Sequence, residues 1–165
     1  MEKMENKQIL KDSESPEAVG VSDKYQISEE VREIVSDLVQ KHHHDLAEAN
    51  ILCLFRKGEW NSNGRTRLAS ASKVPEVWRC LYGYDLMVVI NKNIWVGLEQ
   101  EHKVALVDHE LCHFGQEYDS KGNVKYTMVQ HDIEEFSAVV DRHGLWHQDV
   151  KVFAQYVQMA LQVEE

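Results

Sequence analysis

Apolar and polar positions alternate along the chain with two different periods, one typical of helices and one typical of strands. From residue 28 to about residue 41, apolar residues recur at helical spacing. Ser28 can cap this helix, and the two glutamates after it suit a first helical turn. The helix is expected to end near the three adjacent histidines at 42–44. Neighbouring residues on a helix point in different directions, so we interpret these histidines as surface residues rather than one metal site.

Three segments have the length and composition of strands. Residues 51–56 form a short apolar run, and residues 65–72 alternate polar and small side chains after an Asn-Gly turn. A short helix, opened by Pro75 and closed by Gly83, comes next. Residues 85–91 are the most apolar of the three segments, and we expect them in the centre of a sheet.

Helices dominate the second half of the chain. We expect a helix over 99–114 with Gly115 as its terminating glycine, a second over 132–144 and a third over 148–162. Residues 124–129 could add one more strand. This order predicts an α+β fold, a small zincin-like domain in which a short sheet of three or four strands packs on helices.

Length and composition suggest one folded domain after a tail. Residues 1–24 are polar and charged without periodicity and are predicted to be a flexible tail, which leaves 25–165 as the domain. No apolar run approaches the roughly 18 residues of a membrane span. The N-terminus also lacks the basic start and apolar block of a secretion signal. We therefore expect a cytoplasmic protein that does not engage a membrane.

The charge balance bears on possible partners. The chain has a formal net charge of −10, which would repel a phosphate backbone, so we expect no nucleic-acid partner. A local group of basic residues is interpreted as charges that keep a hairpin edge soluble. It consists of Arg56, Lys57, Arg65, Arg67 and Lys73.

The cysteines do not indicate a disulfide framework. There are three of them, and none forms a Cys-X-X-Cys pair. We expect free thiols and interpret Cys53 and Cys80 as small buried residues.

The segment Asp108-His109-Glu110-Leu111-Cys112-His113 carries the clearest chemical signal. Two imidazoles four residues apart lie on one face of a helix and can reach a single zinc ion. Glu110 follows the first of them and can act as the general base toward a zinc-bound water. The pattern predicts His109 and His113 as metal ligands and Glu110 as the catalytic residue.

A third protein ligand must come from another part of the chain. His131 is the first candidate, because it is expected at the start of the next helix. Glu134 and Glu135, within that helix, are alternatives that could supply a carboxylate. A carboxylate that orients a ligand imidazole is also expected. The candidates for that role are Asp108, Asp132 and Asp141.

Several segments together resemble the phage metallopeptidase domain family, a zincin-like group related in style to SprT-like proteins. The resemblance rests mainly on residues 105–113 and on 131–136 closing at His143-Gly144, and more loosely on 43–47, 51–56 and 83–85. It implies a phage or prophage origin and a zinc site on His109 and His113 with Glu110 as catalytic residue. In SprT-like proteins a histidine shortly before a helical phenylalanine completes the site, which favours His131 here.

These observations predict a zinc-dependent metallopeptidase that hydrolyses a protein or peptide substrate. The alternative is a zinc-stabilised, non-catalytic binding module that acts on a host protein. Both need the metal, whereas only the enzyme needs Glu110. The sequence does not indicate the oligomeric state.

Overall fold

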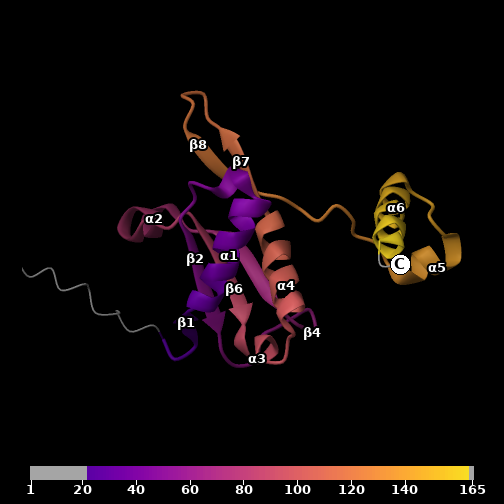
Figure 1. Cartoon of the computed structure of the whole chain (residues 1–165), viewed down its shortest axis with the longest axis horizontal. Helices are drawn as coiled ribbons and strands as arrows, with labels where there is room; N and C mark the ends of the chain where they lie inside the picture. The colour runs from indigo at the N-terminus through magenta and orange to yellow at the C-terminus, as the bar shows by residue number, and fades with distance from the viewer. Residues whose placement is uncertain (1–21, 164–165) are drawn as a thin grey trace, which may run out of the picture. The chain divides into compact units, whose positions relative to one another are not determined.

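The computed structural model describes residues 22–163, and the chain divides into two compact units with the boundary between residues 111 and 112 (Figure 1). The predicted tail, residues 1–24, lies almost entirely outside the described residues. The assignment of 25–165 to a single domain stays a prediction.

A four-stranded mixed sheet forms the centre of the first unit (Figure 1). Its order is β1 (Tyr25–Ile27), β2 (Ile51–Arg56), β6 (Leu86–Asn91) and β5 (Ala69–Lys73). β2 and β6 are parallel, and the two outer pairings are antiparallel. The α+β class, the small sheet and the central position of the most apolar strand are therefore confirmed.

The predicted strand over 65–72 is divided in two. Its first residues form β4 (Arg65–Thr66), which pairs with β3 (Asn61–Ser62), and its later ones belong to β5. The turn between β3 and β4 places both Asn63 and Gly64 at positive φ, 50° and 73°. A two-residue hairpin turn of this handedness matches strand twist and favours Asn-Gly. The tight hairpin explains why the segment does not continue as one straight strand.

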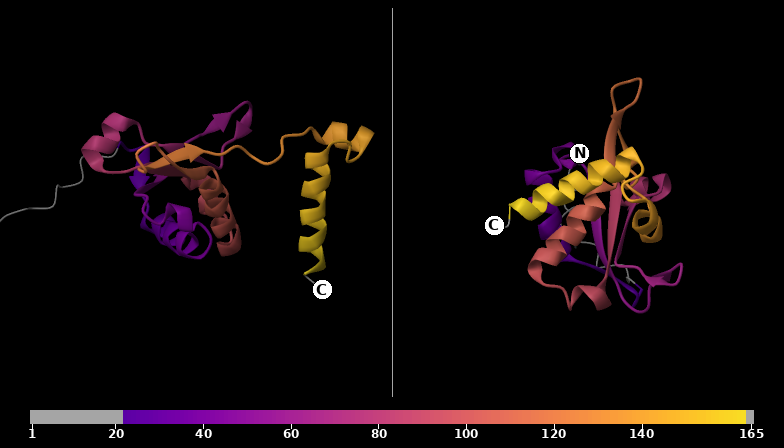
Figure 2. Two further views of the ribbon diagram at one scale, coloured as in Figure 1. Left: turned by 90° about the horizontal axis from the view of Figure 1, so that it is seen from above. Right: turned by 90° about the vertical axis from the view of Figure 1, so that its right-hand side faces the viewer.

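The helices of this unit follow the predicted pattern closely. Ser28 caps α1 by accepting a hydrogen bond from the Val31 N–H at 3.1 Å. Lys103 of α4 and Glu30 of α1 form an ion pair at 3.0 Å, and the two helices lie side by side (Figure 2). The helical elements are α1 (Glu29–Lys41), the 3-10 turn η1 (His44–Leu46), α2 (Glu76–Tyr82), α3 (Lys92–Trp95) and α4 (Gln100–Cys112).

The core of the unit is formed by buried residues of α1, η1, α3 and α4 and by the central strands, with β6 buried along almost its whole length, whereas α2 contributes none. Phe55 meets Trp95 edge to face, with ring centroids 5.6 Å apart. Cys53 is buried as expected, and this burial raises the pKa of its thiol to about 12, so it behaves as a small apolar residue. The most deeply buried apolar residues are Val31, Leu46, Leu86, Val88, Ile90, Trp95, Val107 and Leu111.

Two predictions, one for a cysteine and one for a glycine, are wrong. Cys80, expected to be buried, is exposed on α2. Gly115 does not terminate a helix, because α4 ends at Cys112 and Gly115 lies within strand β7 (Phe114–Tyr118). A Cβ at Gly115 would come within 2.9 Å of the Thr127 Oγ1 atom, so glycine is required there for close strand approach.

The second unit consists of a hairpin followed by two helices. β7 pairs antiparallel with β8 (Val124–Met128), which confirms a strand over most of 124–129. The helix expected over 132–144 is shorter: α5 spans Ser137–His143, and residues 131–136 have no regular helix. The last helix is confirmed as α6 (Gln148–Gln162). Among the described residues, no helix combines the length and apolar character that crossing a bilayer needs.

Candidate metal centre

Helix α4 carries the motif residues at its C-terminal end. Val107 and Leu111 are fully buried and fix the helix on the core. Glu110, between them, is only 6% exposed, whereas His109 is exposed. The helix therefore presents one imidazole outward and keeps the adjacent carboxylate in a desolvated position, where its interactions with charge are strengthened.

His113 follows the end of α4 and is fixed by the hairpin. Its Nδ1 atom lies 2.9 Å from the Val129 carbonyl oxygen, and the Val129 N–H donates to the His113 carbonyl at 2.8 Å. A carbonyl can only accept, so Nδ1 carries the proton in this contact. The lone pair of the neutral ring is then on Nε2, which is the arrangement a metal-ligating histidine needs.

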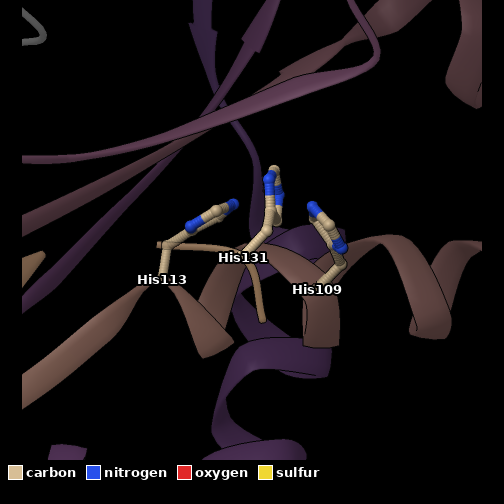
Figure 3. A group of neighbouring side chains, drawn as sticks. All are labelled: His109, His113 and His131. Carbon is tan, nitrogen blue, oxygen red and sulfur yellow. The ribbon is translucent and has the colours of Figure 1, made fainter. Parts of the chain in front are cut away.

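The three predicted histidines come together (Figure 3). One ring nitrogen from each of His109, His113 and His131 lies within 4.8 Å of the other two. The rings of His113 and His131 meet edge to face, with centroids 4.6 Å apart. His131 lies in the irregular segment after β8 and not, as expected, at the start of a helix.

Neither alternative glutamate joins this group in the part of the chain that the structure describes. Glu135 instead accepts hydrogen bonds from the Phe136 N–H at 2.8 Å and from the Trp146 indole at 2.9 Å. Both glutamates precede α5 rather than lying within it, which corrects their predicted position. The carboxylate of Glu135 thus organises the chain before and after α5.

Sequence reasoning missed a contact on the neighbouring face of α4. Asp108 was expected as one candidate to orient a ligand imidazole, and it lies 2.6 Å from the Nε2 atom of His43. The prediction that residues 42–44 are all surface residues is wrong for His43, whose side chain is only 13% exposed. The run of three histidines concealed the signal, because only the fold shows which of them turns inward.

The donor set fits zinc. Three neutral imidazoles are common zinc ligands, and they leave a position open for water. Ligand atoms about 2.0–2.1 Å from one zinc ion lie within roughly 4 Å of each other. The ligand atoms of the three histidines lie within 4.8 Å of one another, which is close to that separation.

Comparison with known families places the chain in a class. A family described as "Putative phage metallopeptidase" matches residues 23–157, and the chain belongs to this family. The resemblance drawn from the motif residues is therefore confirmed, and the family description indicates a peptidase that uses a metal. No curated protein and no solved structure matches the chain.

Proposed function

We propose that this protein is a zinc-dependent metallopeptidase in which His109, His113 and His131 hold the zinc and Glu110 is the general base. The observation that carries the proposal is the grouping of the three imidazoles, with ligand atoms within 4.8 Å, beside a buried glutamate on the same helix. A zinc ion bound there would polarise a scissile carbonyl and lower the pKa of a water molecule.

The residues of the chain have distinct roles in this proposal. Glu110 accepts the proton of the attacking water and passes it to the departing amine, and its burial keeps bulk water from competing for that proton. The Val129 carbonyl orients His113 through its Nδ1–H. This contact fixes both the tautomer and the ring direction. The rotational freedom of a free imidazole is therefore already removed before substrate binds.

The substrate class proposed is a protein or peptide in the cytoplasm of a host cell. The sheet has two outer strands, β1 and β5, each with an unpaired edge within the described sheet. Such an edge allows an extended peptide to add as a further strand. The family description supports a phage or prophage origin.

Metal analysis combined with cleavage of a peptide library tests the proposal on wild type and Glu110→Gln. We expect the variant to keep its zinc and to lose roughly 10²–10⁴-fold in cleavage rate, the usual contribution of a general base. Glu101→Gln, an exposed glutamate in the first turn of α4, is the matched control and should cleave like wild type.

If the wild type and both variants hold zinc and none of them cleaves any peptide, the hydrolase proposal fails. The non-catalytic binding module that acts on a host protein would then be favoured. Cleavage by Glu110→Gln at the wild-type rate would equally exclude Glu110 as the base.

A further inference from the structure

Helix α4 carries a second pair of possible metal ligands beside the first. Asp108 and Cys112 are four residues apart, as are His109 and His113, and each pair is offset from the other by one residue. One residue corresponds to a rotation of about 100° around a helix. The two pairs therefore belong to adjacent faces and share no side chain.

His43 completes the second group. It follows α1, and its Nε2 atom lies 2.6 Å from the Asp108 carboxylate oxygen Oδ1. The ligand atoms of His43, Asp108 and Cys112 all lie within 4.8 Å of one another. His42 and His44 on either side are exposed, so the chain turns only the middle histidine toward α4.

We infer that His43, Asp108 and Cys112 form a second metal site, selective for zinc or a similar divalent transition ion. An imidazole nitrogen, a carboxylate oxygen and a thiolate sulfur are the three ligand types that zinc accepts in proteins. Magnesium and calcium require oxygen ligands and would be poorly served by this set. The inference does not rest on the proposed peptidase activity, because the two groups have no residue in common.

Binding has a defined chemical balance. The hydrogen bond between His43 and Asp108 is exchanged for two coordination bonds: the ring proton moves from Nε2 to Nδ1 through solvent, which leaves the lone pair of neutral His43 on Nε2, and the Cys112 thiol releases its proton to solvent as its sulfur becomes a ligand. His43 is largely shielded from solvent, and Asp108 and Cys112 are both held by α4. Binding an ion therefore costs these side chains little conformational entropy. No oxidant or further reactant takes part.

Cobalt titration of the full chain tests this site separately from the other. Co²⁺ takes the same ligand types as zinc, and a thiolate bound to it gives a charge-transfer absorption in the near ultraviolet that imidazole ligands do not give. We expect the wild type to bind two Co²⁺ ions per chain and to show the thiolate band. Cys112→Ser should lose the band and bind one ion.

Matched variants identify the ligands. Cys80→Ser, at the other exposed thiol, and His42→Ala, next to His43, should keep the band and both ions. His43→Ala and Asp108→Asn should each lower the Co²⁺ affinity of the site that gives the thiolate band by at least about 10-fold, within the range caused by loss of a supporting contact. Cys112→Ser alters only an exposed side chain, so it keeps the test valid if the other two variants fold poorly. Circular dichroism checks that they do fold.

The outcomes separate the two sites. Loss of the band in Cys112→Ser with its retention in His131→Ala supports the second site, whatever the peptidase assay gives. A wild type without a thiolate band overturns the inference, as does a band that survives in Cys112→Ser. If His109→Ala and His131→Ala leave both ions in place, the zinc site of the proposed function fails while the second site stands.

Discussion

His131 reaches the other two histidines from a segment without regular secondary structure. Its ring packs against that of His113, and the two neighbouring glutamates of the same segment do not join the group among the described residues. Glu135 is engaged instead with Phe136 and Trp146. This arrangement supports the proposal that the third ligand is an imidazole.

His131→Ala should therefore lower zinc affinity much more than Glu134→Ala or Glu135→Ala. We expect a loss of more than about 100-fold, because removing a residue that only supports a ligand already costs up to about that factor. Competition with a chromogenic chelator measures the affinities. A larger loss in either glutamate variant would move the third ligand to that carboxylate.

At the residue scale, the sequence predicts which side chains of α4 lie together, but it does not predict which residues from other segments join them. The spacing of His109, Glu110 and His113 needs only the helical repeat to place them together. His43 meets Asp108 across 65 residues of chain, and no local pattern encodes that distance. The placement of Glu135 likewise depends on Trp146, which lies beyond the next helix.

At the scale of elements, one ion pair joins α1 to α4. Partial burial raises the pKa of Glu30, but the charge and hydrogen bond of Lys103 and the nearby Trp95 indole outweigh it, so that the pKa is lowered below 4.5. That indole N–H makes no hydrogen bond of normal geometry within the described residues. The lowered pKa means that the folded state prefers the charged carboxylate.

Stability at acid pH should reflect this pair. A carboxyl whose pKa is lower when folded stabilises the protein above its unfolded pKa of about 4.5, and the contribution disappears as pH falls through the folded value. Glu30→Gln should lower the free energy of unfolding by less than about 1 kcal/mol at pH 7, since the side chain is 47% exposed. Urea unfolding measured from pH 7 down to pH 3 should show the two proteins converging. A difference in the free energy of unfolding that widens toward acid pH would contradict the lowered pKa of Glu30.

The hairpin of β7 and β8 depends on a glycine. A Cβ at Gly115 would lie 2.9 Å from the Thr127 Oγ1 atom and 3.1 Å from the Val129 Cγ2 atom. Gly115→Ala should therefore destabilise the protein by about 1–3 kcal/mol, as overpacking does, and should weaken zinc binding by displacing Val129 from His113. Thermal unfolding and chelator competition measure both effects.

Gly97→Ala is the matched control for this substitution. Its nearest neighbour would be the Ile94 carbonyl at an ordinary 3.7 Å. Equal effects of the two alanines would show that close strand approach is not the reason for glycine at 115.

The elements differ in how far the sequence predicts them. α1 and β6 have strong periodicity or a long apolar run, and tertiary packing agrees with both. The sequence does not predict strand β7, because Phe114 and Gly115 have the pattern of a helix C-terminus. The chain leaves the helix there because backbone pairing with β8 satisfies those residues instead.

At the scale of the whole molecule, we expect the net charge of −10 to disfavour nucleic acid as a partner. Two basic residues near the β3–β4 hairpin contact an aromatic ring of the same region. The guanidinium groups of Arg56 and Arg67 lie over Trp60, at 4.8 and 5.6 Å from its ring centroid. Arg56 also donates to the Glu59 carbonyl. These contacts give two of the five basic residues a local structural partner, and the interpretation that the cluster keeps a hairpin edge soluble stays a prediction.

We therefore expect no binding of a labelled DNA duplex at low salt, where electrostatic attraction would be strongest. Fluorescence anisotropy measures this, with an Arg56→Ala and Arg67→Ala double variant as the control. Binding that falls steeply with salt and is lost in the double variant would show that the hairpin outweighs the net charge.

The reciprocal contacts between His113 and Val129 have a consequence for local motion. Opening the end of the hairpin breaks the Val129 N–H bond to His113 and releases the imidazole at the same time. A metal bound to the other ring nitrogen would hold His113 in place and so oppose this opening. Amide exchange at Val129 would be slowed by the metal, so a single backbone proton would report how fully the site is loaded.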